Sequence, residues 1–242
     1  MSPVLVPPRR HDPELMDRPD NPAADLEGAL DDIRAVNRYL RGSKIMVDAV
    51  RPFLRAMGAG DTMSILDVGT GGADLPKDLV ADARRRGKPV RVVGVDRDPV
   101  TVAYARRLTE DVPEIAIVRA DAFRLPFPAA SFDLVTASMF LHHFTHDDAV
   151  LLLAEFCRVA RRAVIINDLR RHWVSWAFIN LAGRLTRRHR MFIHDAPLSV
   201  LRGFTRQELH AAARDAGGAG ATVVRRLPYR LLLTIPAAHA AA

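Results

Sequence analysis

Apolar and polar positions alternate along this 242-residue chain with two different periods. In its central part, short runs of aliphatic and β-branched residues are separated by longer amphipathic segments. Short apolar runs are typical of strands buried on both faces, whereas apolar residues three or four positions apart indicate helices. The predicted strands are Ser64–Val68, Val90–Val95, Ile115–Arg119, Phe132–Ser138 and Ala163–Asn167, with helices at about 73–86, 99–109 and 146–160. This alternation predicts an α/β fold with a parallel sheet covered on both faces.

Two amphipathic segments precede the first strand. Apolar residues recur at helical spacing over Ala24–Gly42, and a second helix is expected over Lys44–Met57 with a break at Pro52. We expect residues 25–60 to form an N-terminal helical cap over a cleft. Residues 1–24 are rich in Pro, Asp and Arg, which predicts a flexible arm.

The alternation changes after the fifth strand. An insertion at about 170–200 contains a basic aromatic helix, Trp173–Arg190, which we interpret as part of a lid. Thr205–Glu208 has the capping-box pattern and opens another helix. The last two predicted strands, Thr222–Arg226 and Tyr229–Ile235, are joined by so short a link that an antiparallel pair is favoured.

A glycine-rich turn and two acids outline a nucleoside pocket. The turn lies in Asp67–Gly71, directly after the first strand, while Asp96 and Asp121 follow the second and third strands. Glycines let the backbone approach a ligand closely, and an acid at the end of the next strand can accept hydrogen bonds from both ribose hydroxyls. A further acid can accept one from an adenine amino group. The pattern therefore predicts an adenosyl cofactor.

The cofactor-binding candidates come from the ends of the first four strands. They are Asp67, Gly69, Thr70, Gly71, Asp96, Arg97, Asp121, Ala122 and Ser138. Asp67 is expected to brace the loop or to approach the cofactor's amino group. Arg97 lies either against the adenine face or in solvent, and Asp121 either reads the adenine with the Ala122 backbone or caps a turn. The loop itself has the alternative role of a purely structural strand–helix turn.

Two histidines and one acid are the catalytic candidates. His142 and His143 follow the fourth strand, and Asp168 ends the fifth, so they are expected at neighbouring strand ends. A histidine oriented by a carboxylate is a suitable general base for an acceptor hydroxyl. We favour His142 with Asp168 as its partner. The alternative is that these histidines pack or cap the next helix.

These motifs together resemble class I S-adenosylmethionine-dependent methyltransferases over roughly 60–238. The segments that carry the resemblance are Asp67–Gly71, Gly94–Asp96, Ala120–Ala122, Ser131–Val135 and Leu125–Pro128, the last being typical of the small-molecule branch. That branch includes the ubiquinone/menaquinone C-methyltransferases. The resemblance implies a Rossmann-like domain over 61–238, a seven-stranded sheet with an antiparallel last strand, and S-adenosyl-L-methionine as cofactor. Ala73 stands where a third glycine is common, a variant that we expect to be tolerated.

A second resemblance points to the acceptor. Asn37–Leu40, Asn167–Arg170 and His194–Glu208 are similar to methyltransferases found beside type III polyketide synthases and flavin oxidoreductases. It implies a small phenolic, polyketide or quinone-type substrate, with O-methylation favoured and C-methylation as the nearest variant. Asn37 or Arg38 would reach the methionine carboxylate, and His194 and Asp195 would line the acceptor pocket.

Composition narrows the alternatives. A net charge of +7 and a pI near 10.4 suggest nucleic acid, but the arginines are scattered among alanines and no RNA-binding module accompanies them. We therefore expect no nucleic-acid partner, although a non-catalytic cofactor-binding protein stays open. The single cysteine, Cys157, excludes an internal disulfide and a multi-cysteine metal site and fits a cytoplasmic protein without a leader peptide. No metal constellation is apparent along the chain.

The sequence of the aromatic helix is compatible with more than one binding partner. Trp173, Trp176 and Phe178 with a basic tail are compatible with peripheral docking at a membrane over 173–190. The same features suit a packed lid or a dimer contact. The sequence is compatible with a monomer or a homodimer.

Overall fold

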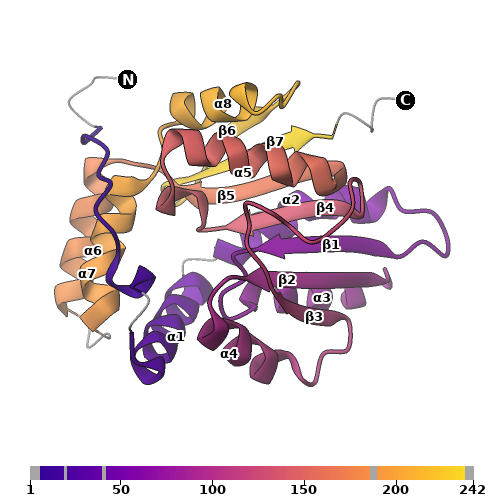
Figure 1. The fold of residues 1–242 in the computed structure, drawn as a ribbon, viewed down its shortest axis with the longest axis horizontal. Coiled ribbons are helices and arrows are strands. Elements are labelled where there is room, and N and C mark those ends of the chain that lie inside the picture. Colours follow the sequence, from indigo (N-terminus) through magenta and orange to yellow (C-terminus); the bar gives the residue numbers. More distant parts are fainter. Residues whose placement is uncertain (1–5, 19–20, 40–41, 186–189, 238–242) are drawn as a thin grey trace.

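The computed structural model describes residues 6–18, 21–39, 42–185 and 190–237, and its centre is one seven-stranded sheet (Figure 1). The strands are β1 Met63–Val68, β2 Val90–Asp96, β3 Ile115–Arg119, β4 Phe132–Ser138, β5 Ala160–Leu169, β6 Thr222–Arg226 and β7 Arg230–Pro236. Their order is β3-β2-β1-β4-β5-β7-β6. The first five are parallel, and β7 runs antiparallel to both β5 and β6. The predicted Rossmann-like sheet with its antiparallel last strand is confirmed.

Helices cover both faces of the sheet. They are α1 Ala23–Tyr39, α2 Gly42–Arg55, α3 Asp74–Arg85, α4 Pro99–Thr109, α5 His146–Val159, α6 Trp173–Leu185, α7 Arg190–Arg202 and α8 Arg206–Asp215. Neighbouring residues of one strand serve opposite layers, since Ile65 packs in a core with α2 and α3 while Leu66 packs in a core with α5 and α8. Both side chains are fully buried. The strand order reverses between β1 and β4, where doubly wound sheets form a crevice at the carboxyl ends of the strands.

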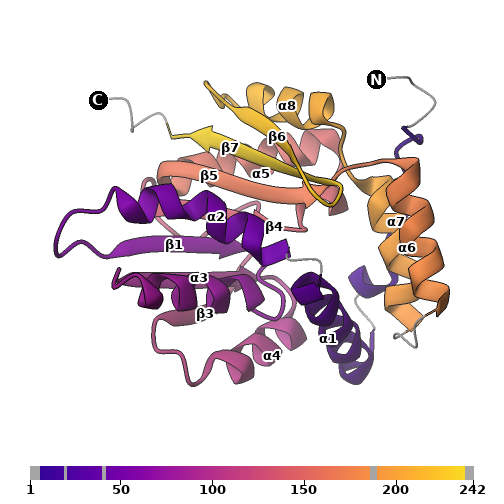
Figure 2. The same ribbon diagram turned by 180° about the vertical axis from the view of Figure 1, so that it is seen from behind.

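Two helix predictions are wrong. Pro52 lies inside α2 and does not break it, because buried Val50 and Leu54 hold the helix against the sheet on either side of the proline. The helix predicted over Trp173–Arg190 extends too far: α6 covers Trp173–Leu185, and a second helix, α7, begins at Arg190 and stands beside α6 beyond the strand ends (Figure 2). Residues 186–189 lie outside the described part of the chain. Within that part, no helix is long and apolar enough to cross a membrane.

The described part of the predicted flexible arm is held against α7. We call residues 6–18 the N-terminal strap, which includes a short 3-10 helix, η2, at Leu15–Asp17 (Figure 1). The carboxylate of Asp195 on α7 accepts hydrogen bonds from the backbone amides of Leu15 at 2.8 Å and Met16 at 3.0 Å. Arg202, also on α7, donates to the backbone oxygen of Asp12 at 2.9 Å. These bonds satisfy backbone groups that a free arm would leave to water, so over 6–18 the prediction is wrong.

Candidate active site

A large cavity, of about 1410 Å³, lies at the carboxyl ends of the strands. Its walls come from the N-terminal strap, α1, α6, α7 and the loops that follow β1, β2, β3 and β4. Pockets for one small molecule usually measure about 300–1000 Å³. The cavity therefore has room for a cofactor and a second molecule together.

The turn after β1 brings the backbone to the cavity wall. Gly69 and Gly71 have φ angles of 66° and 52°, in the left-handed region that glycine adopts without strain. A Cβ atom at Gly69 would overlap the ring of Phe140, so the turn and the loop after β4 need the absence of a side chain there. Ala73 has a φ of 58° and is fully buried, which makes it a strained residue where related turns carry glycine.

Asp67 is a buried brace for this turn. Its carboxylate accepts hydrogen bonds from the hydroxyls of Thr70 at 2.9 Å and Thr136 at 2.8 Å. Burial raises the pKa of Asp67 to about 7, against the smaller opposing effect of the two hydroxyls. The bracing role expected for Asp67 therefore fits its surroundings, and its carboxyl is poised to change charge near neutral pH.

Asp96 meets the same turn from the end of β2. Its carboxylate accepts hydrogen bonds from the backbone amides of Gly71 and Asp98, each at 3.2 Å. Burial raises the pKa of Asp96, partly offset by these amides. Oxygens that face the cavity next to the glycine turn suit the two hydroxyls of a ribose. The residues present thus fit an adenosyl group.

The remaining cofactor candidates also line the cavity. Asp121 is exposed, and its carboxylate caps the following turn by accepting from the amide of Phe123 at 3.0 Å. Arg97 is exposed at the rim beside it, and Ala122 lies next in the wall. Ser138, at the end of β4, accepts a hydrogen bond from the amide of Asn167 at 3.1 Å. All nine candidates therefore share one cavity.

The predicted pairing of His142 with Asp168 is present. Nδ1 of His142 lies 2.6 Å from the carboxylate of Asp168, which also accepts the backbone amide of His142 at 3.1 Å. Both side chains are buried, and Asp168 stands behind the histidine rather than in the cavity wall. Burial acts to raise the pKa of Asp168, but the imidazole of His142 and the amide of Leu169 outweigh it and hold that pKa below its ordinary value. Because Nδ1–H donates to Asp168, Nε2 of His142 carries a lone pair toward the cavity.

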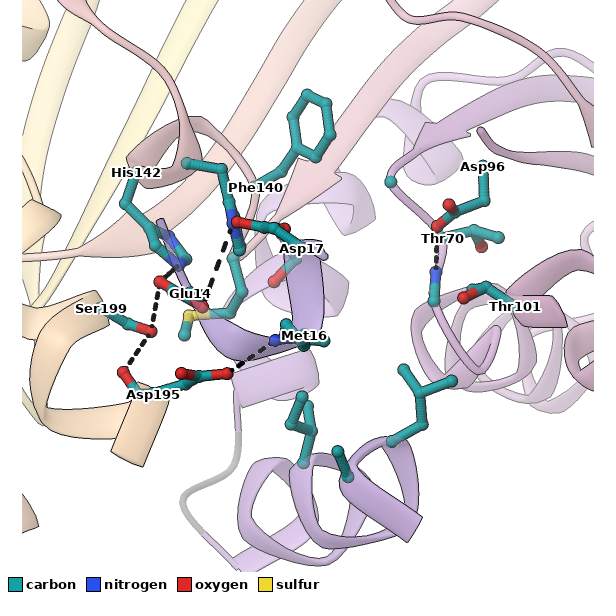
Figure 3. Close-up of a pocket in the computed structure, with 18 of the residues that line it drawn as sticks. Glu14, Met16, Asp17, Thr70, Asp96, Thr101, Phe140, His142, Asp195 and Ser199 are labelled. Atoms are coloured by element: carbon teal, nitrogen blue, oxygen red, sulfur yellow. Dashed lines mark hydrogen bonds and ion pairs between the residues drawn. The ribbon is translucent and has the colours of Figure 1, made fainter. Parts of the chain in front are cut away.

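Glu14 is a site residue that the sequence did not reveal. It lies on the N-terminal strap, is 1% exposed, and accepts a hydrogen bond from the hydroxyl of Ser199 on α7 at 2.8 Å. Its two carboxylate oxygens are 3.9 Å from Nε2 of His142 and 4.0 Å from Nδ1 of His143. In Figure 3 this group lies on one side of the cavity and Thr70 and Asp96 lie on the other. No motif marks Glu14, because only the folding of the strap brings it to the histidines.

His143 has a different environment from His142. Its Nδ1 lies 3.1 Å from the carboxylate of Asp17, which is on the same strap. Burial lowers the pKa of His143, but the hydrogen bond to Asp17 and the charge of Glu14 raise it further, so it ends above its ordinary value. His143 lines the cavity without a carboxylate behind it on the sheet.

The residues predicted to line the acceptor pocket and to reach the methionine carboxylate differ in where the structure places them. Asp195 is in the cavity wall, but its carboxylate is engaged with the strap amides. His194 points away and is 53% exposed, with its ring 2.8 Å from Asp195. The side chains of Asn37 and Arg38 lie outside the described part of the structure.

Much of the cavity wall is apolar. Apolar side chains of the strap and of α1, α6 and α7 contribute to it: Met16, Leu26, Leu30, Ile33, Val174, Phe178, Ile179, Met191 and Phe192. Such a surface suits a planar, weakly polar molecule. Val174 and Phe178 are also 49% and 61% exposed, so the apolar wall continues to the surface of α6.

Comparison with known proteins agrees with this geometry. Residues 66–166 match the family model described as a methyltransferase domain. The chain is 32% identical over 108 residues to the ubiquinone/menaquinone biosynthesis C-methyltransferase UbiE of Laribacter hongkongensis, covering 45% of this chain and 43% of the relative. It is 33% identical over 147 residues to the demethylmenaquinone methyltransferase of Beutenbergia cavernae, covering 59% and 56%. The chain thus spans about half the length of these curated relatives.

A solved structure extends the likeness in fold. The CurJ carbon methyltransferase superposes with a TM-score of 0.67 at 11% identity, covering 92% of this chain and 62% of the other. The strand order, the glycine turn and the matched segment identify a class I S-adenosylmethionine-dependent methyltransferase domain. Within this class, the chain resembles the ubiquinone/menaquinone C-methyltransferases.

Proposed function

We propose that this protein transfers the methyl group of S-adenosylmethionine to a small aromatic acceptor of phenolic or quinol type. One observation carries the proposal: the buried His142–Asp168 pair opens into the same cavity as the glycine turn and Asp96. An adenosyl pocket beside an oriented base is what a methyltransferase of hydroxyl-bearing molecules needs.

The cofactor would lie along the turn after β1. Asp96 would hold the ribose hydroxyls, Asp121 and the Ala122 backbone would read the adenine, and Asp67 would attract the cationic amino end. Gly69 and Gly71 let the backbone lie against the ligand. The sulfonium supplies an already activated methyl group, so the protein mainly has to position the acceptor and exclude water.

His142 would take the acceptor's proton. Its Nε2 lone pair faces the cavity because Nδ1–H is bonded to Asp168. An ordinary phenol has a pKa near ~10, so removal of its proton at neutral pH needs a base, which contributes roughly 10²–10⁴-fold. Nε2 would hold this proton, and the bound S-adenosylmethionine would supply the methyl group to the resulting phenolate, with S-adenosylhomocysteine as the second product. Asp168 stabilises the resulting imidazolium.

The acceptor class follows from the apolar part of the cavity wall. The side chains of α6 and α7 suit an aromatic ring of phenolic, polyketide or quinone type. We favour attack by the oxygen, and methylation of a ring carbon is the second candidate. The names of the two curated relatives favour that second candidate, and the same phenolate would activate the ring for it.

The wider setting of the enzyme belongs to the same proposal. A single cysteine, half-buried, fits a cytoplasmic protein. Trp173, Val174, Phe178 and Leu181 of α6 are exposed apolar side chains. They support the predicted contact of 173–190 with either a lipid surface or a second copy of the chain.

Calorimetric titration and a product assay test the proposal. Wild type should bind S-adenosylmethionine, and Asp96→Ala should weaken binding at least tenfold while Glu27→Gln, a partly exposed control on α1 outside the cavity wall, should not. Mass spectrometry with a panel of phenols and quinols should then detect methylated product. Its fragmentation distinguishes O- from C-methylation. Binding without S-adenosylhomocysteine formation across the panel would favour a non-catalytic cofactor-binding protein instead.

A further inference from the structure

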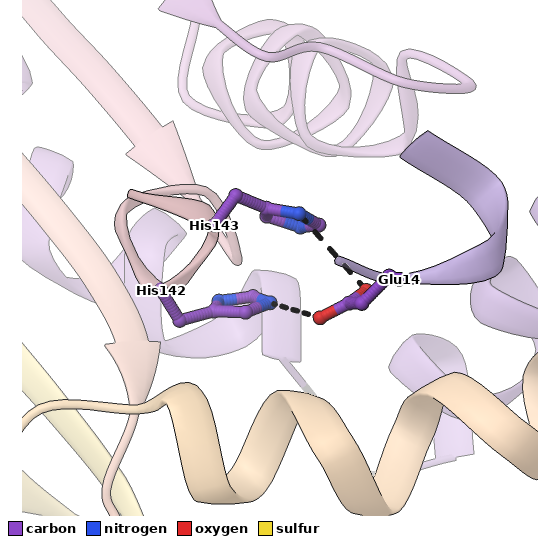
Figure 4. Close-up of side chains that lie close together, drawn as sticks. All are labelled: Glu14, His142 and His143. Carbon is purple, nitrogen blue, oxygen red and sulfur yellow. Dashed lines mark ion pairs between the residues drawn. The ribbon is translucent and has the colours of Figure 1, made fainter. Parts of the chain in front are cut away.

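We propose that Glu14, His142 and His143 form a binding site for a first-row divalent cation, with Zn²⁺ as the reference ion. The site lies at the acceptor end of the cavity, where both imidazole rings are turned toward the carboxylate of Glu14 (Figure 4). Two nitrogens and one carboxylate form a ligand set found in catalytic zinc sites. Along the sequence no such constellation is apparent, because more than a hundred residues separate Glu14 from the histidines.

The ligand atoms are already close to coordinating positions. One ring nitrogen of each histidine and one Glu14 oxygen all lie within 4.8 Å of one another. The two nitrogen–oxygen distances to Glu14 are 3.9 Å and 4.0 Å. Ligands at about 2.0–2.2 Å from a tetrahedral zinc ion are roughly 3.2–3.6 Å apart. A shift of less than ~1 Å would therefore close the site around the ion.

Side chains next to the proposed metal ligands hold those ligands in place. Asp168 accepts Nδ1–H of His142, which fixes the tautomer that presents Nε2 as a lone pair. Carboxylate–histidine pairs of this kind orient metal ligands and strengthen them. Ser199 donates to Glu14 at 2.8 Å, and Asp195 anchors the backbone of the strap beside it. These contacts orient His142 and Glu14, whereas Nδ1 of His143 faces the carboxylate of Asp17 at 3.1 Å and has to lose its proton to become a ligand.

The charges around the histidines also favour a cation. Nε2 of His142 and the carboxylate of Glu14 face each other at 3.9 Å, and with neutral His142 both are hydrogen-bond acceptors. Asp17 and Asp168 bring further negative charge to 3.1 Å and 2.6 Å from the two rings. Arg202 balances part of this negative charge, and an ion between the groups would balance more of it.

One fixed cation, the guanidinium of Arg202, already lies close to the same carboxylates. Arg202 has Nη1 3.9 Å from Glu14 and 3.6 Å from Asp17, while its other nitrogens donate to the backbone oxygens of His142 and His143. The Glu14 and Asp17 oxygens near Nη1 are the same ones that face the histidines, so an ion bound there would share the two carboxylates with the guanidinium. Asp17, 3.1 Å from Nδ1 of His143, is near enough to become a fourth ligand.

The role of the ion rests on the proposed function. A divalent cation beside the acceptor would bind its oxygen and lower the pKa of the phenol, as a Lewis acid does for bound water. With Nε2 of His142 engaged by the ion, the acceptor would lose its proton to solvent through this effect rather than to the histidine. The acceptor class that fits is a phenol with an oxygen free to coordinate, such as a catechol or quinol.

Metal binding is tested on the full-length protein stripped with a chelator. Titration with ZnCl₂ should give one tight site per chain, confirmed by elemental analysis after gel filtration. Glu14→Gln keeps an oxygen for Ser199 but loses the charge, and it should weaken Zn²⁺ binding by at least 100-fold. Glu27→Gln is the matched control and should not change it. Both variants should bind S-adenosylmethionine as the wild type does, which shows that they are folded.

The outcomes separate this proposal from the function. No Zn²⁺ binding by the wild type, or equal binding by Glu14→Gln, overturns the metal site. Methyl transfer by the stripped enzyme at the full rate, with Zn²⁺ bound in the calorimeter, retains the site and overturns its role. Zn²⁺ binding without methyl transfer to any acceptor leaves the site intact and counts against the proposed function alone.

Discussion

The buried carboxyl of Asp67 should make cofactor binding depend on pH. Its pKa in the free protein is about 7 because burial disfavours the charged form. S-adenosylmethionine carries net positive charge, and an opposite charge close by lowers a carboxyl pKa by about 1–3 units. Binding should therefore expel the proton that Asp67 holds below pH 7. Affinity should rise with pH up to about 7 and then level off.

The size of the effect follows from the pKa of about 7. At pH 6.5 about three quarters of the free molecules hold the proton, so about 0.7 proton should leave per cofactor bound. If the bound pKa is about 5, the dissociation constant should be about four times larger at pH 6.5 and about ten times larger at pH 6.0 than its plateau above pH 7.

Asp67→Asn removes this coupling with little change of shape. The new amide can still accept from the hydroxyl of Thr70, and Thr136 can donate to the backbone oxygen of Leu66, 3.3 Å away. The variant should bind the cofactor more weakly at pH 7.5, and Asp67 should no longer contribute to proton release. Asp215→Asn, at the end of α8 and outside the cavity wall, is the control that keeps the wild-type behaviour.

Calorimetry in two buffers of different ionisation enthalpy measures the proton release directly. The wild type should show an observed enthalpy that changes between buffers at pH 6.5, by the enthalpy difference times about 0.7. Equal buffer dependence in the wild type and in Asp67→Asn would refute the reasoning, since another group would then supply the proton.

Three further variants test the catalytic pair, the turn and the core. Asp168→Asn should lower kcat by roughly 10²–10³ in steady-state assays, because Asp168 orients the base. It should leave the dissociation constant of the cofactor unchanged in binding assays, because Asp168 stands outside the cavity wall. An equal loss of kcat and of cofactor affinity would contradict this. Gly69→Ala should weaken cofactor binding by more than tenfold, whereas Gly60→Ala, also at positive φ but in open space, should lower only stability. Calorimetry measures the loss of binding, and thermal melts measure the loss of stability. Phe156→Ala should reduce the free energy of unfolding by about 3–5 kcal/mol in denaturant titrations. Leu151 is 61% exposed, so Leu151→Ala should reduce it by less than about 0.5 kcal/mol. Similar losses in the two variants would show that Phe156 is not a core residue.

The sheet was predictable because its signals are local. Strand Phe132–Ser138 has the bounds that its apolar run predicts, since a strand buried on both faces is apolar along most of its length. Ile115–Arg119 and Thr222–Arg226, the two edge strands, also have their predicted bounds although they are largely exposed. The pairing of His142 with Asp168 also followed from sequence, because the carboxyl ends of adjacent parallel strands meet at one edge.

Other parts of the site depend on contacts that no local pattern encodes. Glu14 sits in a segment with the composition of a free arm and is buried only because Ser199 and Asp195 on α7 receive it. The boundary between α6 and α7 was missed because residues 186–189 contain no glycine or proline that would indicate a break in the sequence. In α2, tertiary packing overrode the local preference of Pro52.

The residues proposed to bind the cofactor and the residues proposed to bind the acceptor lie in different parts of the chain, because the strap, α6 and α7 form the acceptor side. The segment shared with other methyltransferase domains, 66–166, contains the glycine turn, Asp96, Asp121 and His142. Glu14, Asp168 and the apolar walls of α6 and α7 lie outside it. Likeness over that segment therefore says what the donor is and nothing about which molecule receives the methyl group. Exchanging the strap together with residues 170–202 between two such proteins should change which acceptor is methylated. Exchanging only one of the two segments should give a cavity whose walls do not pack against each other.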